Sequence, residues 1–346
     1  MKALVVAPAW IGDAVMAQVL FMRLHQHTPD LQLDALAPSW VAPVLQRMPE
    51  IAQVFDNPFA HGELSFSARY RLARQLAQNG YQRAYVLPNS LKSALVPFLA
   101  GIPQRIGFTG EARYGLINRR HTLDAAVLPQ MAERFAQLAE LPGSPLPRPL
   151  PLPRLGSNTA QQAETLAMLR IEPPAKIAVF CPGAEYGPAK RWPTRHFAAL
   201  ADELAKRGYA VWLLGSAKDK AVGDDIIRQS TAPAALKNLC GTTSLTQAID
   251  LIATSRFVVC NDSGLMHVAA ALDRPLVAVY GSSSPGFTPP LSERAQIISL
   301  HLECSPCFKR ECPLGHLNCL NLLEPKRVLE ACLNADRADQ AIGVTS

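Results

Sequence analysis

Short apolar runs alternate with amphipathic segments along the first half of the chain. Ala3–Ala7, Gln32–Leu36 and Ala84–Leu87 are apolar enough for buried strands, whereas Asp13–His27 and Ser67–Asn79 repeat apolar residues at helical spacing. Buried strands that alternate with helices are typical of parallel sheets, because each return to the same sheet edge needs a crossover. The pattern therefore predicts an α/β fold in which helices cover a parallel sheet.

The same alternation restarts in the second half. Helices are expected at Thr159–Arg170 and at Thr194–Arg207, the latter with Thr194 as its N-cap. Further apolar runs predict buried strands at Lys176–Cys181, Val211–Gly215, Phe257–Asn261 and Leu276–Tyr280. The chain is thus expected to hold two successive α/β domains.

Between the two halves, residues 142–153 read PGSPLPRPLPLP and contain six prolines. Proline removes backbone donors and blocks helix continuation, so this stretch is expected to be an extended, stiff linker between domains. We place the domains at residues 1–172 and 173–346. Two α/β domains joined in this way predict a ligand cleft between them.

Composition narrows the class of protein. Of the 346 residues 49% are hydrophobic and 18% charged, which excludes a largely disordered chain. No apolar run is long enough to span a bilayer, and the apolar start is interpreted as a buried strand rather than a signal peptide, so a cytoplasmic protein is predicted.

The net charge of +6 is modest for this length, and part of it gathers around Arg105, Arg113 and Arg120. A nucleic-acid binder is usually more basic. The positive charge favours binding of a small anionic ligand or an anionic lipid head group. The alternative, a basic surface that only contacts water, explains the charge equally well.

Asp13 follows the first predicted strand in the turn PAWIGDAV. Ligands of open α/β sheets bind at the carboxyl ends of strands, where a carboxylate beside the flexible Gly12 can act as a general base. The alternative is an acidic residue in the first turn of a helix, which the helix dipole favours. A dinucleotide fingerprint is excluded, because this turn has one glycine where that motif needs three.

A second candidate segment, CPGAEYGPAKRWP at residues 181–193, follows a predicted strand of the second half. It is a loop that carries Glu185, Lys190 and Arg191. A lysine in such a loop can neutralise the charge that builds up on a phosphate leaving group. A solvated basic loop is the alternative, and Trp192 anchoring its end makes that less attractive.

The strongest local signal is VVCNDSGLMHVAAAL at residues 258–272, where a strand ends at Asn261 and a helix opens. The free N–H groups of such a helix start form an anion site, and Ser263 and Gly264 allow close approach of a pyrophosphate. Asp262 is either a helix cap or a ligand contact, and His267 lies on the same helical face as Ser263. A Ser–His hydrolase is disfavoured because the G-x-S-x-G pattern is missing.

Metal chemistry receives little support. The chain has no D-x-D pair, which disfavours a sugar-nucleotide enzyme that chelates a divalent ion through that motif. Four cysteines cluster in CSPCFKRECPLGHLNC, at positions 304, 307, 312 and 319, with spacings unlike standard zinc or iron–sulfur sites. Reduced thiols that pack a loop are the favoured interpretation, and a structural metal stays open.

Together these motifs resemble the bacterial ADP-heptose:lipopolysaccharide heptosyltransferases of glycosyltransferase family nine. PAWIGDAVM, LPNSLKSALVPFLAGIP, RIGFTGEARYGLIN and YGSSSPGFTPP extend the resemblance nearly end to end, and GAEYGPAKRWP is closer to the heptosyltransferase II branch. The resemblance implies a GT-B fold of two Rossmann-like domains, an acceptor domain followed by a nucleotide-sugar domain. It also implies inverting, metal-independent transfer of L-glycero-D-manno-heptose from ADP-heptose to heptosyl-Kdo2-lipid A, without a cofactor, by an enzyme peripheral to the inner membrane.

The resemblance also implies roles for particular residues. Asp13 would be the base and Lys190 would stabilise the departing ADP. The donor-binding set would be Glu185, Asp219, Ser244, Leu245, Asp262, Ser263, Gly264 and His267. The acceptor-binding set would be Lys92, Arg105, Arg113 and Arg120. Heptosyltransferase I, a family relative with another acceptor, a nucleotide-sugar epimerase of the same architecture and a non-catalytic scaffold remain as alternatives.

Overall fold

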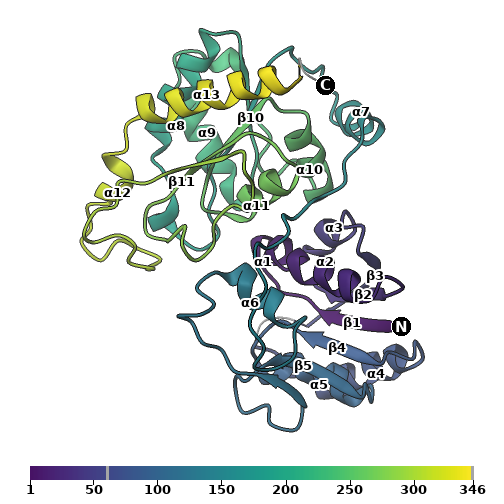
Figure 1. Cartoon of the computed structure of the whole chain (residues 1–346). Coiled ribbons are helices and arrows are strands. Elements are labelled where there is room, and N and C mark those ends of the chain that lie inside the picture. The colour runs from purple at the N-terminus through teal and green to yellow at the C-terminus, as the bar shows by residue number, and fades with distance from the viewer. Residues whose placement is uncertain (60–61, 344–346) are drawn as a thin grey trace. The chain divides into compact units, whose positions relative to one another are not determined.

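The computed structural model describes residues 1–59 and 62–343. The chain divides into two compact units, Met1–Leu155 and Gly156–Ser346, each folded around its own sheet (Figure 1). The division lies upstream of the residue 172 boundary expected from the sequence. Helix α7 (Thr159–Met168) is part of the second unit, where Thr165 Oγ1 donates to Asp250 Oδ2 at 3.0 Å.

Over residues 1–59 and 62–155, the first unit holds a six-stranded parallel sheet in the order β3-β2-β1-β4-β5-β6. Its strands are β1 (Lys2–Val6), β2 (Gln32–Ala37), β3 (Ile51–Asp56), β4 (Arg83–Val86), β5 (Gln104–Phe108) and β6 (Arg119–His121). Its helices are α1 (Ile11–Met16), α2 (Gln18–His27), α3 (Ala42–Leu45), α4 (Phe66–Ala77), α5 (Leu91–Leu99) and α6 (Met131–Gln137). The single helix predicted for Asp13–His27 is therefore divided at Ala17.

Polar contacts tie the proline-rich stretch to the first unit. Arg148 Nε donates to Glu133 Oε1 of α6 at 2.9 Å. The fully buried Gln18 of α2 donates to the Arg154 carbonyl at 2.7 Å and accepts from the Arg154 N–H at 2.9 Å. The stretch contains no helix or strand, with a turn at residues 142–143, and it is a packed part of the first unit and not a free spacer.

The described part of the second unit, residues 156–343, repeats the architecture, with a parallel sheet in the order β12-β11-β10-β7-β8-β9. Its strands are β7 (Ile177–Cys181), β8 (Ala210–Leu213), β9 (Leu236–Asn238), β10 (Phe257–Asn261), β11 (Leu276–Val279) and β12 (Ala295–Ile298). Besides α7 its helices are α8 (Thr194–Ala205), α9 (Lys220–Gln229), α10 (Leu245–Ala253), α11 (Gly264–Ala271), α12 (Asn318–Asn321) and α13 (Pro325–Gly343), with 3₁₀ turns at Pro188–Lys190, Ala217–Asp219 and Pro233–Ala235.

Helices cover both faces of the second sheet. Helices α8, α9 and α13 pack together on one face, and α7, α10 and α11 pack on the other (Figure 1). Trp192, Phe197 and Phe180 form the aromatic centre of the core beneath α8. The prediction that Thr194 caps α8 is wrong: Pro193 occupies that position, and the Thr194 hydroxyl donates to the carboxylate of Asp225 instead.

In both sheets the first strand of the unit lies at the centre, between its second and fourth strands. The chain crosses over in opposite directions on either side of it, so the crevice for a ligand opens at the carboxyl ends of β1 and β4 in one unit and of β7 and β10 in the other. No helix within residues 1–59 and 62–343 combines the length and the apolar character that crossing a membrane requires.

Candidate active site

The segments after β7 and β10 meet at the crevice of the second sheet. Lys190 ends the 3₁₀ turn after β7, and its Nζ lies 2.6 Å from Oδ2 of Asp262, the first residue after β10. The side chain of Asp262 is 5% exposed and that of Lys190 is 18% exposed. A largely buried carboxylate needs a partner, so this ion pair fixes where the ammonium group lies.

Asn261 at the end of β10 holds the same two segments together through its side chain. Its amide donates to the Pro182 carbonyl at 2.7 Å, and its Oδ1 accepts the Trp192 N–H at 3.0 Å. Trp192 is itself buried and donates through Nε1 to the Leu323 carbonyl. Both ends of the loop between Pro182 and Trp192 are thus fixed, and Lys190 is presented from a rigid base.

His267 of α11 is buried beside the Lys190–Asp262 pair. Burial, with the positive charge of Lys190 adding to it, lowers the pKa of His267 to about 4, while the Asp262 carboxylate opposes the shift. The imidazole is therefore neutral at neutral pH and can act as a hydrogen-bonding group, not as a second cation.

The amino end of α11 opens immediately after Asp262. Ser263 is its N-cap in extended conformation, and its side chain does not bond the helix amides. Ser263 and Gly264 are half-buried. The first amides of α11 follow directly after Asp262, the partner of Lys190, and free amides at a helix start can bind phosphate groups. Ser263, not Asp262, is the cap of α11, and the Asp262 carboxylate pairs with Lys190; its contact with a ligand stays a prediction.

The other residues of the predicted donor set lie in the segments that follow β7, β8 and β9, at the same edge of the sheet. Glu185 pairs with Lys218 on the surface. Ser244 is exposed and caps α10, accepting the Gln247 N–H at 3.2 Å, and Leu245 behind it is half-buried.

Asp219 has an internal role. Its Oδ2 accepts from the N–H and the hydroxyl of Ser216, at 2.9 and 2.8 Å, and its Oδ1 lies 3.8 Å from the Arg191 guanidinium. A Cβ atom at Gly183 would lie 2.4 Å from this carboxyl group. Only glycine leaves room for it, so Asp219 binds the loops after β7 and β8 to each other.

In the first unit, Asp13 lies in the first turn of α1, directly after the loop that follows β1. The loop is braced by Trp40, whose Nε1 donates to the Ala9 carbonyl at 2.9 Å. Asp13 is half-buried at the carboxyl edge of the central strand. This placement suits a base that faces a ligand and equally suits a residue that stabilises the start of the helix.

The predicted acceptor-binding cations separate into two kinds. Arg113 is 2% exposed and donates to the Pro88 and Phe108 carbonyls at 2.7 and 2.6 Å and to Asn89 Oδ1 at 3.0 Å. Arg105 likewise donates to the carbonyls of Ile102, Leu116 and Gly115. These two guanidinium groups hold loops in place, and burial lowers the pKa of each.

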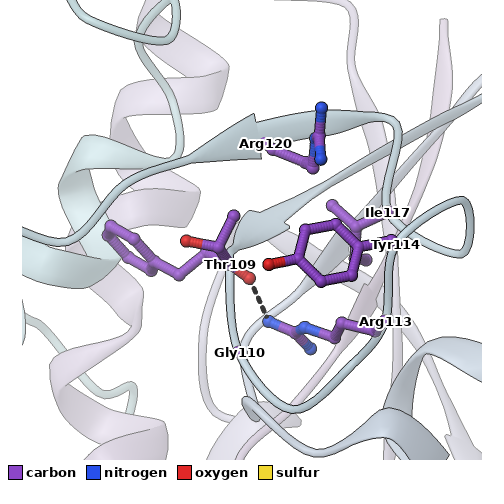
Figure 2. A pocket seen from close by; sticks show the side chains of 7 residues that line it. Thr109, Gly110, Arg113, Tyr114, Ile117 and Arg120 are labelled. Atoms are coloured by element: carbon purple, nitrogen blue, oxygen red, sulfur yellow. Dashed lines mark hydrogen bonds between the residues drawn. The ribbon is translucent and has the colours of Figure 1, made fainter.

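The remaining two cations are more accessible. Arg120 of β6 is exposed and lies over the ring of Tyr114, which is 72% exposed (Figure 2). Arg120 and Tyr114 line a small pocket, whose other walls are formed by Arg113, Thr109, Gly110 and Ile117. Lys92 at the start of α5 donates to the Gly62 carbonyl and is half-buried.

This division gives a prediction for stability. Arg113→Ala removes a buried guanidinium that donates to three acceptors, of which the Phe108 carbonyl is buried, so we expect the free energy of unfolding to fall by about 2–3 kcal/mol. Arg120→Ala, its matched control on the neighbouring strand β6, should stay within about 0.5 kcal/mol of the parent. Urea unfolding followed by circular dichroism measures both. Equal stability of the two variants would show that Arg113 does not hold the loop.

Cys304, Cys307 and Cys312 lie in the loop between β12 and α12, and Cys319 lies in α12 itself. All four are half-buried and line one cavity with Ser282, Ala189 and His316. Burial raises the pKa of the Cys319 thiol, and the other three thiols of the cluster add to that shift. Backbone amides of residues 314–317 lower the pKa of Cys312. The remaining cysteines, 181, 240, 260 and 332, are buried in the core, as predicted.

Several residues at this edge were not singled out by the sequence analysis. Tyr186 lies against both Lys190 and Arg310, with its ring centre 5.0 Å from Lys190 Nζ. Ser282 and Ser283 follow β11 and are buried, and neither hydroxyl has a hydrogen-bond partner within the described residues. The serine run GSSS was visible in the sequence, but only its position after a strand adjacent to β10 marks it as part of the site.

Comparison with known proteins agrees with this architecture. Residues 69–318 match the model of glycosyltransferase family 9 (heptosyltransferase). Lipopolysaccharide heptosyltransferase 2 of Escherichia coli K12 is 46% identical over 342 residues, which cover 97% of this chain and 98% of the relative. Lipopolysaccharide heptosyltransferase 1 of Pseudomonas aeruginosa is 26% identical, covering 90% of this chain and 87% of the relative.

A solved structure extends the likeness to three dimensions. The structure of E. coli ADP-heptose lps heptosyltransferase II has a TM-score of 0.89 and 43% identity, and the match covers 98% of this chain and 100% of that one. The fold is thus GT-B-like, as the resemblance implied. On its sequence and its fold, the chain belongs to glycosyltransferase family 9, the heptosyltransferases.

Proposed function

We propose that the protein transfers L-glycero-D-manno-heptose from ADP-heptose to the heptosyl-Kdo2-lipid A inner core of lipopolysaccharide. The observation that carries this proposal is the Lys190–Asp262 ion pair beside the open amino end of α11, a site built for a diphosphate. The E. coli relative of known structure is named an ADP-heptose heptosyltransferase, and this name supports ADP-heptose as the donor. The higher identity to heptosyltransferase 2 than to heptosyltransferase 1 supports the acceptor.

On the donor side, the charge that develops on departing ADP is met by fixed groups. Lys190 supplies a cation held at one position by Asp262 and Asn261, and the α11 amides supply oriented N–H donors. The neutral His267 can hydrogen-bond the diphosphate or the sugar without adding charge. Ser244 and Leu245 border the adenine, and Asp219 and Glu185 shape the loops around the nucleotide.

On the acceptor side, Asp13 removes the proton from the acceptor hydroxyl as its oxygen attacks the anomeric carbon. One C–O bond forms while the bond to the ADP oxygen breaks, so the anomeric configuration inverts. Arg120 and Lys92 contact anionic Kdo and phosphate groups, whereas Arg105 and Arg113 hold the loops that present Arg120. The acceptor is a lipid, so the enzyme works at the inner-membrane surface.

Product analysis tests the proposal. The purified enzyme is incubated with ADP-heptose and either Kdo2-lipid A or heptosyl-Kdo2-lipid A, and the masses of the products are measured by mass spectrometry. We expect one heptose to be added to the heptosylated core only. Addition to Kdo2-lipid A alone would identify a heptosyltransferase 1, and conversion of the sugar nucleotide without an acceptor would identify an epimerase.

Donor binding is expected to need no Mg²⁺ or Mn²⁺, because Lys190 and the α11 amides take the place of a bridging cation. Titration calorimetry with ADP should give the same affinity with and without added Mg²⁺, whereas Lys190→Gln should weaken binding in both conditions. The proposal of metal-independent transfer fails if ADP binds only when a divalent ion is added.

A further inference from the structure

The segment from Cys304 to Cys319, here called the cysteine loop, runs from the connection after β12 into α12. It has no role in the proposed reaction, yet it brings four sulfur atoms to one place. Cys304, Cys307, Cys312 and Cys319 all line the same cavity, although they are spread over sixteen positions of the sequence. Each is half-buried, and none forms a disulfide. A reduced thiol contributes little more to the stability of a loop than a small apolar side chain does. Four thiols gathered from both ends of one loop are instead typical of a site whose ligand holds the loop closed.

A second observation at this cavity is independent of the cysteines. Ser282 lies on the cavity wall and is 2% exposed, and within residues 1–59 and 62–343 its hydroxyl has no hydrogen-bond partner. A buried hydroxyl without a partner is costly, so such groups generally face a bound ion, water or ligand.

We propose that Cys304, Cys307, Cys312 and Cys319 bind one thiophilic divalent metal ion, zinc or iron, in a tetrahedral thiolate site. Four metal–sulfur bonds form, and the four thiol protons are released to solvent. Among the described residues, no three His, Cys, Asp or Glu side chains are already grouped to hold a metal. The ion would therefore draw the half-buried thiols that line this cavity toward a common centre.

The position of the loop indicates what the metal does. The Arg310 carbonyl accepts the Ala189 N–H at 3.0 Å, and the Phe308 carbonyl accepts the Tyr186 hydroxyl at 2.8 Å. The Phe308 N–H in turn donates to the Ser282 carbonyl at 2.7 Å. The cysteine loop is thus the support against which the Lys190 loop is built. The metal would fix that support and would not touch the substrate, so this inference is compatible with metal-independent transfer.

Metal content and cobalt spectroscopy test the site without any measurement of activity. Protein purified under reducing conditions should contain about one zinc or iron per chain by elemental analysis. After the metal is removed, Co²⁺ should restore about one equivalent and produce the intense thiolate-to-cobalt charge-transfer absorption. Cys307→Ser and Cys312→Ser should each lose stoichiometric binding, whereas Cys332→Ala, a buried thiol of α13 outside the cluster, should keep it.

Thermal unfolding provides a second measurement in case a variant folds poorly. Zn²⁺ added to the metal-free parent should raise the unfolding temperature, because an ion that binds only the folded state stabilises it. Binding of Zn²⁺ without the cobalt–thiolate absorption would place the metal elsewhere and overturn the assignment. The absence of metal from the reduced parent protein, together with no cobalt absorption, would overturn the proposal altogether. Neither result bears on heptosyl transfer, so the two proposals fail separately.

Discussion

Asp13→Asn should reduce turnover by roughly 10²–10⁴-fold while leaving ADP affinity unchanged. Asparagine keeps the size and most hydrogen bonds of the side chain but cannot accept a proton, and general-base catalysis contributes about 3–5 kcal/mol to lowering a barrier. The role as a first-turn helix residue predicts a different outcome, a loss of about 0.3–1 kcal/mol of stability and no loss of rate. Steady-state kinetics with the heptosylated core acceptor, beside calorimetry with ADP, separate the two.

Asp30→Asn is the matched control for this variant, because Asp30 is an exposed carboxylate of the same unit, in the loop before β2. It should retain parent activity. Near-parent turnover in Asp13→Asn would mean that another residue is the base and that Asp13 serves the start of α1.

Replacing Lys190 with glutamine should lower kcat by about 10²–10³-fold, the range found when one preorganised group that stabilises developing charge is removed. Affinity for ADP should fall less, because the cation matters most when the bond to ADP is breaking. The variant should also be less stable, since the largely buried Asp262 carboxylate loses its ion-pair partner. Kinetics and urea unfolding are therefore measured on the same preparations.

Two controls separate catalysis from folding at this position. Lys218→Gln removes an exposed lysine that pairs with Glu185 on the same unit and should change neither kcat nor stability. Asp262→Asn retains the cation but removes the carboxylate that fixes it, and should lower kcat by less than Lys190→Gln. If Lys190→Gln loses stability but keeps its kcat, Lys190 serves only to neutralise Asp262.

The central strands were predictable because they are buried on both faces. Strand β10 was expected at Phe257–Asn261 and is found there, since every residue of the run is buried. Five strands within the described residues were missed. β3, β6, β9 and β12 lie at the sheet edges, and the runs IAQVFD and AQII of β3 and β12 are mixed. β5 lies inside its sheet, but its run QRIGF opens with two polar residues. The division between α1 and α2 at Ala17 has no marker residue, because neither glycine nor proline stands there.

The loops of the donor site were predictable, but their pairwise contacts were not. The segments around Lys190 and Asp262 each show loop chemistry after a strand, yet the ion pair joins residues 72 positions apart and depends on β7 and β10 being neighbours. The arginines illustrate the opposite limit. Arg113 and Arg120 cannot be told apart by residue type. Only the tertiary structure buries Arg113, which donates to two backbone carbonyls and the Asn89 amide oxygen, and leaves Arg120 exposed.

The strand order of each unit also governs how the chain can fold as it leaves the ribosome. Each unit is continuous in sequence, so residues 1–155 can complete their sheet before the second unit is synthesised. Within each unit, however, one partner of the central strand is synthesised late. β1 pairs with β4 and β7 with β10, 80 and 79 positions later in the chain. Until that partner emerges, the central strand presents an unpaired edge. The nascent chain is therefore most prone to aggregate just before β4 and again just before β10.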